Sequence, residues 1–372
     1  MPSTIQMDKI GRLGFGYMRL PRKGAEFDTE QIKKMADAFI DSGGTYFDAA
    51  FVYEGAEAAL CESVVKRYPR ENFRIATKLN LHFVEKPEQM AEQFKTSTQR
   101  LGTDHVDFYL LHGIGAAASK KAEELGAWDY LSDLKAKGLI SHMGFSLHAP
   151  PEELDEILSK HPEAEFVQLQ INYIDWDNPK VQSRKLYEVA RKHNTPIIVM
   201  EPVKGGMLTG DTSPIAKLLR DANPKVSMAS WALRFAAQLE GVFVTLSGMS
   251  TYEQLADNIA TFENMKPLSD GELTVLKKAA EIFDAVPRVA CTSCRYCVKD
   301  CPSNILIPVL IDIYNSYLIY NTTTNLDHGY KIWTRTNGKA GDCVACRVCE
   351  GICPQKLDIV ETLEKTSALF DV

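Results

Sequence analysis

The sequence predicts an α/β fold: a closed (β/α)8 TIM barrel in residues 1–285, followed by a smaller α-rich domain in residues 286–372. Three observations lead to this prediction. Before residue 285, eight short β-rich runs alternate with eight longer amphipathic patterns, and eight of the nine cysteines lie beyond residue 290. Strands that alternate with helices pair in parallel through right-handed crossovers. Eight such units in roughly 250 residues are what a closed barrel requires, and a doubly wound open sheet is the alternative.

The barrel elements follow one another in order along the chain. The strand candidates are rich in β-branched, aromatic and other apolar residues, and they span 13–18, 44–50, 73–79, 106–112, 140–146, 166–172, 195–203 and 241–249. The helix candidates carry apolar residues at helical spacing, and they span 29–41, 56–68, 87–101, 128–137, 151–158, 179–193, 226–237 and 252–263. The change of period between neighbouring segments separates strands from helices.

Composition and charge exclude several classes of function. Hydrophobic residues make up 45% and charged residues 24% of the 372 residues, which is typical of a globular protein. The net charge of −7 argues against a nucleic-acid partner. The N-terminal segment lacks the pattern of a secretory signal, and the most apolar window, residues 305–320, is interrupted by polar residues and too short to span a bilayer. We therefore expect a cytoplasmic protein that binds neither nucleic acid nor a membrane.

Polar residues stand at the C-terminal ends of four predicted strands. Asp48 closes the second strand, Lys78 the third, His112 the fourth and Ser146 the fifth. Singly, such residues are often helix caps, surface lysines or core histidines. The active sites of (β/α)8 barrels lie at this end of the strands, so the four residues together predict an active site there.

Residues 8–265 resemble the aldo-keto reductases. The resemblance rests on five segments that occur in the family's order: TYFDAAFVYEGAEAAL, IATKL, YLLHG, GFS and VQLQIN. It implies an oxidoreductase that uses NAD(P)(H) and acts on a small-molecule carbonyl or alcohol. The implied catalytic residues are Asp48, Tyr53, Lys78 and His112.

The chemistry of carbonyl reduction explains these residue types. Hydride transfer builds negative charge on the carbonyl oxygen, so a proton donor must stand beside it. In the family's division of labour, Tyr53 is that acid, and the ammonium of Lys78 lowers the pKa of the phenol. Asp48 pairs with Lys78 so that the buried ammonium is balanced, and His112 orients the substrate by a hydrogen bond.

The resemblance also implies where the cofactor binds. Polar groups after the fifth and sixth strands hold the nicotinamide carboxamide in the family, and Ser146 and Gln168 match them. The stretch SGMSTYEQLADN, residues 247–258, resembles the family's adenosine-phosphate loop, which leads into a helix N-terminus. The full set of cofactor-binding candidates is Gly16, Tyr17, Met18, Ser146, Gln168, Met200, Pro202, Ser247, Gly248, Met249, Gln254 and Asn258.

The cofactor site departs from the family pattern. Leu147 stands where the family usually has Asn, and Met200 where an aromatic residue commonly stacks on the nicotinamide. These departures leave a flavin, FMN, as an alternative cofactor of the barrel.

The phosphate loop also lacks its usual cations. Gly248 and Gln254 occupy positions where Lys and Arg often occur. Without a cation near the ribose 2′-phosphate, we expect only a weak preference for NADPH over NADH, unless Lys204 or Arg234 reaches that phosphate.

The C-terminal cysteines form two matching runs. CTSCRYCVKDCP and CVACRVCEGICP both read C-x2-C-x2-C-x3-C-P, with Pro302 and Pro354 after the last cysteine. This run, found twice, is the signature of a bacterial-type ferredoxin with two [4Fe-4S] clusters, in which the fourth cysteine of each run ligates the other cluster. The signature assigns Cys291, Cys294, Cys297 and Cys353 to one cluster, and Cys343, Cys346, Cys349 and Cys301 to the second. Zinc is the alternative metal, and Cys61 is expected to be a small buried hydrophobe.

Together these features predict a barrel that couples carbonyl or alcohol chemistry to iron-sulfur electron transfer. A nicotinamide moves two electrons as a hydride and a cluster moves one, so a flavin in the barrel would bridge the two. An external ferredoxin or flavodoxin is then a candidate partner. A non-catalytic electron-carrier or regulatory subunit is the remaining alternative.

Overall fold

The computed structural model describes residues 5, 10–24, 26–179, 181–210, 213–263, 265–291, 293–353 and 355–371, with Ala116 described by its backbone only. Pro354 therefore lies outside the described residues. The chain divides into two compact units: Met1–Val203 with Ala229–Ser269, and Lys204–Met228 with Asp270–Val372. Besides the predicted domain at 286–372, the second unit thus contains residues 204–228 and 270–285, which the sequence analysis placed in the barrel.

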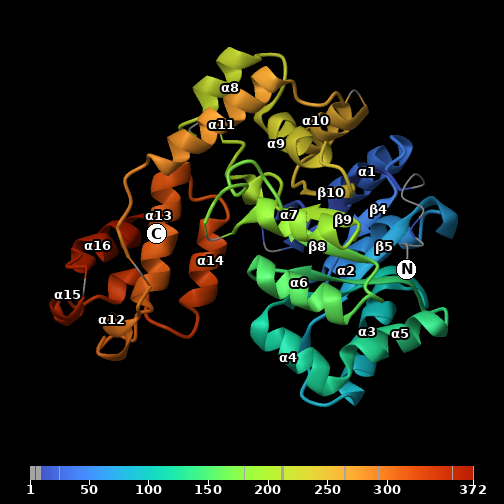
Figure 1. The fold of residues 1–372 in the computed structure, drawn as a ribbon, viewed down its shortest axis with the longest axis horizontal. Coiled ribbons are helices and arrows are strands. Elements are labelled where there is room, and N and C mark those ends of the chain that lie inside the picture. The colour runs from blue at the N-terminus through green and yellow to red at the C-terminus, as the bar shows by residue number, and fades with distance from the viewer. Residues whose placement is uncertain are drawn as a thin grey trace. The chain divides into compact units, whose positions relative to one another are not determined.

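The first unit is a closed barrel of eight parallel strands, which confirms the predicted fold class (Figure 1). The strands pair in the order β1-β10-β9-β8-β7-β6-β5-β4, and β4 pairs with β1 to close the sheet. Their bounds are β1 Leu13–Gly16, β4 Tyr46–Asp48, β5 Arg74–Leu79, β6 Val106–Ile114, β7 Ile140–Leu147, β8 Phe166–Gln170, β9 Ile197–Met200 and β10 Val242–Gly248. Each predicted strand is present, with ends that differ by a few residues.

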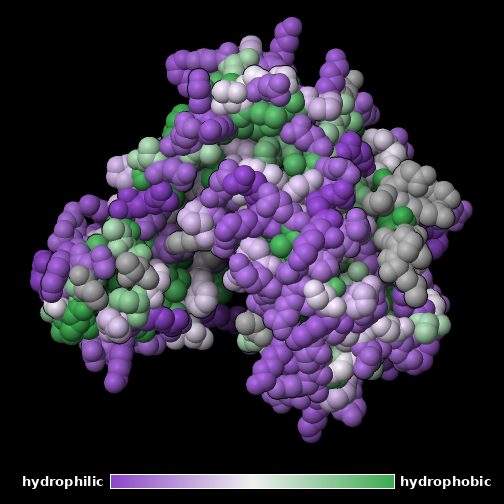
Figure 2. All heavy atoms as spheres, in the orientation of Figure 1, coloured by the Kyte–Doolittle hydropathy of each residue, from purple (hydrophilic) through white to green (hydrophobic). Residues whose placement is uncertain are grey.

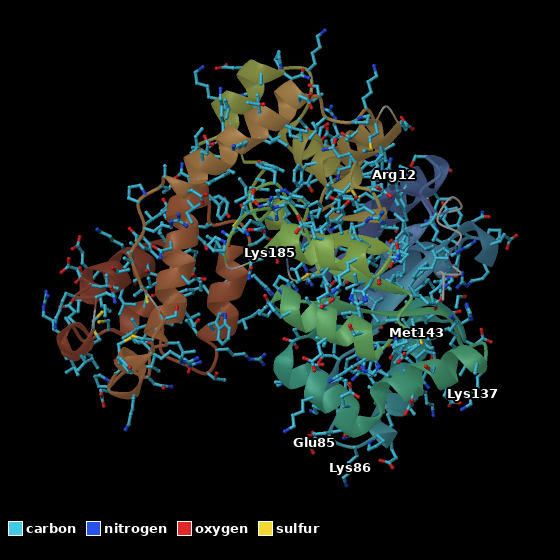
Figure 3. The ribbon with its side chains drawn as sticks, viewed as in Figure 1. Arg12, Glu85, Lys86, Lys137, Met143 and Lys185 are labelled. Carbon is cyan, nitrogen blue, oxygen red and sulfur yellow. The ribbon has the colours of Figure 1, made fainter. Side chains whose placement is uncertain are left out.

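The helices of the barrel lie outside the strands. They are α1 Thr29–Asp41, α2 Ala56–Leu60, α3 Glu88–Leu101, α4 Ala116–Leu125, α5 Ala127–Ala136, α6 Pro151–Lys160, α7 Ser183–Lys192, α9 Met228–Ala237 and α10 Tyr252–Glu263. Figure 3 marks this division: Lys137 and Lys185 belong to the outer helical layer, whereas Met143 on β7 is buried. In the part of the chain that the structure describes, no helix has the length and apolar character needed to cross a bilayer.

Several elements differ from the sequence prediction. The predicted helix 56–68 is shorter in the structure: α2 ends at Leu60, and one π-helical turn, Cys61–Val65, follows it. The helix predicted from residue 179 begins only at Ser183, because Gln182 before it adopts a left-handed conformation. Elements that the sequence analysis did not predict are α4, the hairpin β2–β3 (Arg22–Lys23 and Glu26–Phe27), α8 (Ala216–Ala222) and α11 (Asp270–Asp284).

Helix α1 illustrates why the sequence folds as it does. The carboxylate of Asp28 accepts a hydrogen bond from the backbone N–H of Gln31 and so caps the first turn. Ile32, Met35 and Phe39 recur at helical spacing and are buried. Inside the barrel, aromatic residues from alternate strands pack together, namely Tyr46 of β4, Phe108 of β6, Phe166 of β8 and Phe243 of β10.

The strand register brings the predicted site residues to one rim of the barrel. Gly16 at the end of β1 lies opposite both Asp48 and Gly248. The register between β6 and β7 shifts between Leu111 and Ile114, so His112 sits in an irregular stretch of its strand. Such a bulge changes the direction of a side chain relative to the regular ladder.

The second unit is helical. It contains α8, α11, α12 (Tyr296–Lys299), α13 (Ile307–Tyr320), α14 (Leu326–Trp333), α15 (Val348–Ile352) and α16 (Ile359–Phe370). Figure 1 shows α13 and α14 side by side in orange. Its core joins apolar residues of α13 and α16 with three buried cysteines, Cys297, Cys349 and Cys353.

The two cysteine runs adopt the same backbone path. Ser293 and Ala345, which precede the second cysteine of each run, have φ of 55° and 54°. Arg295 and Arg347, which follow that cysteine, have φ of 65° and 57°. Each run then forms a short helix, α12 or α15, and these two helices pack against each other. The sequence repeat is therefore also a structural repeat.

Candidate functional site

The barrel rim holds a buried ion pair. The ammonium of Lys78 lies 2.7 Å from a carboxylate oxygen of Asp48 and also donates to the carbonyl oxygen of Ala49 at 2.7 Å. The side chain of Lys78 is only 1% exposed. Burial by itself lowers the pKa of Lys78, but the negative groups around it, Asp48 foremost, outweigh burial, so that the pKa is raised above its ordinary value. Lys78 is therefore a permanent cation at this rim.

Tyr53 and His112 stand around this cation. The ammonium nitrogen of Lys78 lies 5.1 Å from the centre of the Tyr53 ring. The His112 ring meets the Tyr53 ring edge to face, with 5.8 Å between the ring centres. The structure thus brings the four predicted catalytic residues together at the C-terminal ends of β4, β5 and β6 and in the loop after β4.

Two opposing effects act on the pKa of Tyr53. The sequence predicted that the ammonium of Lys78 lowers this pKa, and the ammonium does so, but burial has the larger effect. Burial raises the pKa of Tyr53, because it disfavours the charged phenolate, and the ammonium of Lys78 opposes this effect without cancelling it. Tyr53 is therefore a protonated phenol at neutral pH.

His112 is neutral for the same physical reason. Burial, and then the ammonium of Lys78, lower the pKa of His112 to about 3. Its Nδ1 atom is buried and has no hydrogen-bond partner among the described residues. A neutral imidazole beside a phenol can hydrogen-bond an oxygen of a ligand, but it cannot supply the proton of the reaction.

Two further predicted residues lie next to this group, and they can recognise an amide. The hydroxyl of Ser146 accepts the backbone N–H of Gly113 at 2.8 Å, and Nε2 of Gln168 donates to Asp48 at 3.4 Å. The hydroxyl proton of Ser146 and the carbonyl oxygen of Gln168 then remain for a ligand. A carboxamide needs one donor and one acceptor, so these two side chains fit a nicotinamide.

The side chains of four other cofactor candidates are buried in the barrel or bonded within it. Tyr17 is buried, and its hydroxyl lies 3.0 Å from that of Ser63. Met249 is buried, and Nδ2 of Asn258 donates to Ser247 at 2.9 Å, tying α10 to β10. These four side chains therefore have a structural role, whether or not they also contact a cofactor.

The remaining candidates lie on the rim or near it. Gln254 accepts the backbone N–H of Ser250 at 2.7 Å and so shapes the loop before α10. Met18 and Gly248 are exposed, Met200 is half-buried and Pro202 is buried. Gly16 ends β1 between Asp48 and Gly248.

The sequence analysis missed an ion pair at the rim. Arg19, which follows β1, lies 3.4 Å from Glu201, which follows β9 and has φ of 56°. The side chain of Arg19 runs along Gly248, where a Cβ atom would lie 3.6 Å from that of Arg19. Arg19 directly follows the predicted strand 13–18, but Glu201 falls inside the predicted strand 195–203, so the predicted elements gave no signal for the pair.

The two alternative cations named from the sequence are placed differently. Arg234 is buried and donates to the backbone carbonyls of Lys266 and Pro267. Lys204 belongs to the second unit, where its ammonium lies 6.0 Å from the ring centre of Tyr320. Arg234 is thus held by the fold. Among the described residues, Arg19 lies beside Gly248 of the phosphate loop, and the ammonium of Lys34 lies 4.1 Å from the ring centre of Tyr252 in the same loop.

A buried carboxylate, that of Glu57, also contacts the residues next to the rim. Glu57 accepts hydrogen bonds from Thr77 at 2.7 Å and from Arg100 at 3.3 Å. It also raises the pKa of Lys78, though less than Asp48 does. Glu57 therefore fixes the start of α2, four residues after Tyr53, against β5.

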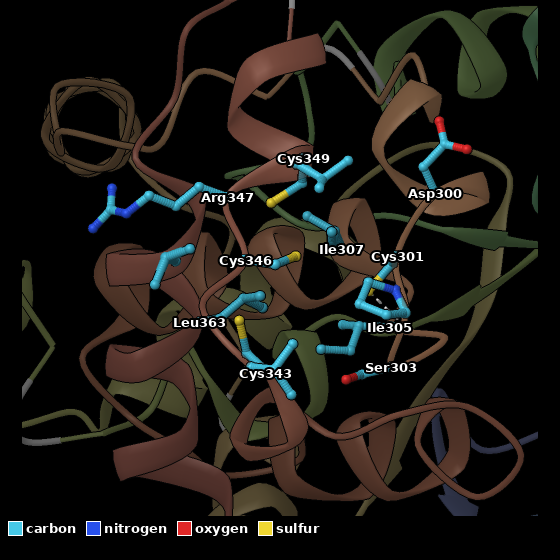
Figure 4. A pocket seen from close by; sticks show the side chains of 14 residues that line it. Asp300, Cys301, Ser303, Ile305, Ile307, Cys343, Cys346, Arg347, Cys349 and Leu363 are labelled. Atoms are coloured by element: carbon cyan, nitrogen blue, oxygen red, sulfur yellow. Dashed lines mark hydrogen bonds between the residues drawn. The ribbon is translucent and has the colours of Figure 1, made fainter.

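In the second unit, four cysteines line each of two cavities. Cys301, Cys343, Cys346 and Cys349 line the first, which has an empty volume of about 320 Å³. Figure 4 shows their side chains around this space, with Cys301 across from the other three. Cys291, Cys294, Cys297 and Cys353 line the second, of about 340 Å³. In each cavity, one run supplies three cysteines and the other run its fourth.

The cavities suit a cluster better than a single ion. Among the residues described, no three His, Cys, Asp or Glu side chains converge as the ligands of one metal ion do. A zinc ion would draw its thiolates to about 2.3 Å, whereas a cube of four irons keeps them around a larger space. All nine cysteines are free thiols, and backbone N–H groups of Ser293 and Ile305 point at the sulfurs of Cys291 and Cys301 at 3.5 Å.

The buried thiols need a positive partner to ionise. Burial raises the pKa of Cys297 and of Cys349 to about 11. Iron binds thiolates, and its positive charge reverses this effect of burial. Cys61, which belongs to neither cavity, is buried beside Gly102, and burial raises the pKa of its thiol as well.

Comparisons with known proteins match both parts of the chain. The profile of the Aldo/keto reductase family matches residues 12–281, and that of a 4Fe-4S dicluster domain matches residues 290–357. An aldo-keto reductase of Strobilurus tenacellus is 28% identical over 220 residues, which are 55% of this chain and 62% of that protein. The NADH-specific methylglyoxal reductase of Escherichia coli is 22% identical over 275 residues, covering 62% of this chain and 81% of that protein.

The fold has a matching solved structure. An aldo-keto reductase from Klebsiella pneumoniae, in complex with NADPH, superposes with a TM-score of 0.60 at 21% identity, over 72% of this chain and 90% of that chain. The closed barrel, the profile match over most of the chain and the cysteine runs within residues 290–357 all point the same way. This chain belongs to the aldo/keto reductase family of oxidoreductases and carries a 4Fe-4S dicluster domain, which follows the barrel in the sequence.

Proposed function

We propose that the barrel reduces a small carbonyl compound, or oxidises the corresponding alcohol, with NAD(P)(H). The observation that carries this proposal is the group formed by Lys78, Asp48, Tyr53 and His112: a fixed cation, its counter-charge, a protonated phenol and a neutral imidazole at one rim. A bound nicotinamide would supply or accept the hydride. The residues of the chain then have only the proton and the substrate oxygen to handle.

Tyr53 handles the proton. In reduction, its hydroxyl gives a proton to the carbonyl oxygen as negative charge develops there, and the ammonium of Lys78 stabilises the phenolate that remains. In oxidation, the same phenolate takes the proton from the alcohol. His112, being neutral, donates a hydrogen bond that positions the substrate oxygen, and Ser146 with Gln168 orients the carboxamide of the cofactor.

The choice between NADH and NADPH rests on Arg19. Its charge is beside the phosphate loop, but Glu201 neutralises much of it. We therefore keep the expectation that the two cofactors bind with dissociation constants within about tenfold of each other, since a 2′-phosphate must compete with Glu201 for the guanidinium. Among the relatives, the Escherichia coli protein is named for NADH and the Klebsiella pneumoniae structure contains NADPH. Titration of both nucleotides, followed by fluorescence, measures this ratio.

A Tyr53→Phe variant tests the catalytic assignment. We expect carbonyl reduction to fall by about 10²–10⁴-fold, the usual contribution of a positioned acid, with nucleotide binding unchanged. Tyr187→Phe is the matched control, because its hydroxyl bonds Glu240 on the outer surface of the barrel. Turnover of Tyr53→Phe near the wild-type rate would refute the role of Tyr53.

We further propose that the cysteine cavities hold two [4Fe-4S] clusters with crossed ligation. The support is that each cavity takes three cysteines from one run and the fourth from the other. Cys301→Ala should then remove the cluster held by Cys343, Cys346 and Cys349, halving iron and sulfide. Mössbauer and EPR spectra of Cys301→Ala and Cys346→Ala should match, whereas Cys353→Ala should resemble Cys294→Ala; the opposite pairing contradicts crossed ligation. Cys61→Ala is the control.

Coupling between the two sites is the finer part of the proposal. One alcohol oxidation releases two electrons, and two clusters that take one electron each can hold both. A flavin is the group that exchanges both one and two electrons, so FMN in the barrel stays the alternative to NAD(P)(H). Anaerobic purification with quantification of iron, sulfide and flavin separates these possibilities. Protein that contains clusters but turns over no carbonyl with either cofactor would favour an electron-carrier subunit.

A further inference from the structure

The surface around the cysteine cavities is unusually apolar. Tyr296, Val344, Val348 and Ile352 are 64%, 66%, 44% and 39% exposed. Large exposed hydrophobic side chains cost free energy in water, and when they gather in one place they mark an interaction site. These four make up a large share of such side chains in the described part of the second unit. We call the surface formed by these four residues the cluster face.

The four residues lie together because the two cysteine runs pack together. Tyr296 begins α12 and lines the second cavity, whereas Val344 and Val348 line the first. Val348 and Ile352 belong to α15, and α15 packs against α12. Figure 2 shows hydrophobic atoms on the surface where α15 lies in Figure 1.

The segments that form the cluster face also carry basic side chains. Residues 293–300 and 343–356 contain four basic residues, Arg295, Lys299, Arg347 and Lys356, against the two acids Asp300 and Glu350, a net charge of +2. The chain as a whole carries −7. Arg347 and Glu350 pair with each other at 2.9 Å, so their charges offset, and Arg295, Lys299 and Lys356 remain against Asp300. The cluster face is therefore locally positive on an acidic protein.

The same surface exposes one cysteine of each cavity. Cys294 and Cys346 are exposed, whereas Cys297, Cys349 and Cys353 are buried. A group held by these cysteines therefore has one edge near solvent beneath the cluster face. Electron exchange with a protein docked there would need no rearrangement of the chain.

We propose that the cluster face docks a small acidic protein that carries one electron at a time. The proposal rests on the iron-sulfur function proposed above. Apolar contact at the centre gives such an encounter its affinity, and the basic rim attracts an acidic carrier and orients it. In the exchange the reduced carrier loses one electron, the docked chain gains it, and no proton or bond is transferred. A second copy of this chain is a poorer fit, because face-to-face pairing would place the two basic rims opposite each other.

The test measures the rate at which dithionite-reduced [2Fe-2S] ferredoxin, used as an acidic carrier, reduces the oxidised protein in a stopped-flow instrument. Wild type should react fast at low salt and slow down as salt screens the charges. Arg295→Glu/Lys299→Glu/Lys356→Glu should react about 10–100-fold more slowly at low salt and lose most of its salt dependence. Tyr296→Ser/Val344→Ser should weaken saturation by the carrier about tenfold while keeping the salt dependence.

The matched control is Ile332→Ser/Trp333→Ser. These two side chains on α14 are 55% and 49% exposed and line neither cavity, so their loss should leave the rate unchanged. Iron content, the absorption spectrum and reduction by dithionite alone must match wild type in every variant. If wild type lacks clusters or dithionite cannot reduce it, the iron-sulfur proposal has failed, and docking fails with it.

Two results would overturn the docking proposal alone. The first is cluster-face variants that carry normal clusters and accept electrons from the carrier at the wild-type rate. The second is self-association of wild type in sedimentation experiments that the same variants abolish, which would assign the cluster face to a second copy of the chain.

Discussion

The barrel rim and the cysteine cavities bury reactive groups in opposite ways. At the rim, the polypeptide itself balances the charge of Lys78, through Asp48 and the carbonyl of Ala49. In the cavities, burial raises the pKa of Cys297 and Cys349, and the positive charge that would offset it belongs to the proposed iron. One site is complete as folded, and the other is built around a group that the chain does not supply.

The two sites also differ in backbone conformation. The rim residues stand on or just after regular parallel strands, although Glu201 has positive φ. The cysteine runs hold non-glycine residues such as Ser293, Arg295, Ala345 and Arg347 in the left-handed region. Each such residue costs about 1 kcal/mol relative to ordinary conformations. From this difference we expect the barrel to fold without a metal, whereas the second unit should depend on its metal.

The largest expected effect is that metal removal unfolds the second unit and leaves the barrel folded. We expect anaerobic chelation of iron to expose the amides of α12, α13, α15 and α16 to hydrogen exchange, because metal binding supplies the folding free energy of such sites. The amides of β4 to β9 should keep their protection. Hydrogen exchange with mass spectrometry reports both units in one experiment. Equal protection of the second unit with and without iron would show that the cavities are self-supporting.

Removal of the counter-charge at the rim should have the next largest effect. Asp48→Asn leaves the ammonium of Lys78 buried and unbalanced, and breaking such a pair costs about 3–5 kcal/mol. Asp48→Asn/Lys78→Met, which removes both charges, should recover much of that loss. Denaturant unfolding of the holoprotein, followed by hydrogen exchange at β4 and β5, measures the difference. A double variant as unstable as Asp48→Asn would mean that the pair is not what stabilises the rim.

Substitution of Gly55 should have a smaller effect on stability. Gly55 lies two residues after Tyr53 and has φ of 71°. A Cβ atom at this position would lie 2.7 Å from the Phe27 ring of the β2–β3 hairpin. Gly55→Ala should cost about 1–3 kcal/mol more than Gly24→Ala, which has φ of 65° but meets nothing within 4 Å. If the hairpin positions Tyr53, kcat should fall with Gly55→Ala and recover partly in Gly55→Ala/Phe27→Leu. Identical unfolding midpoints of the two alanine variants would exclude the contact.

The effect that is smallest near neutral pH, and that grows as the pH falls, concerns His112. The folded pKa is about 3, below the ordinary value of 6.5, so the unfolded chain takes up a proton between these values and the folded chain does not. Stability should therefore fall as pH decreases from 6.5 toward 3, by up to about 1.4 kcal/mol per pH unit from this group. His112→Gln should show a shallower slope than wild type and than His328→Gln, which replaces an exposed histidine. Parallel slopes in all three would show that His112 titrates normally.

Much of the barrel could be predicted because its signals are local. Strands and helices alternate with distinct periods, and all eight strands appear where the sequence places them. Helix starts were less predictable, since the left-handed residue Gln182 before α7 is an ordinary side chain. Helix α4 was missed because its run of Ala, Lys and Glu has no clear apolar face.

The site shows the same limit. Asp48, Lys78 and His112 could be grouped from sequence because strand ends of a barrel share one rim. The pair of Arg19 and Glu201 could not, because 182 residues separate its members and no spacing rule joins them. The pKa of Tyr53 could be predicted only in part: the lowering effect of Lys78 could be inferred from the sequence, and the larger effect of burial could not.

The segment Lys204–Met228 leaves the barrel after β9, belongs to the second unit, and returns at α9. Met207 packs there against the core that α13 and α14 share. During synthesis, this segment must leave the ribosome well before the helices that will hold it. The two units are therefore interleaved in the sequence rather than joined end to end. Exchange of the C-terminal part for another domain would have required changes in residues 204–228 as well.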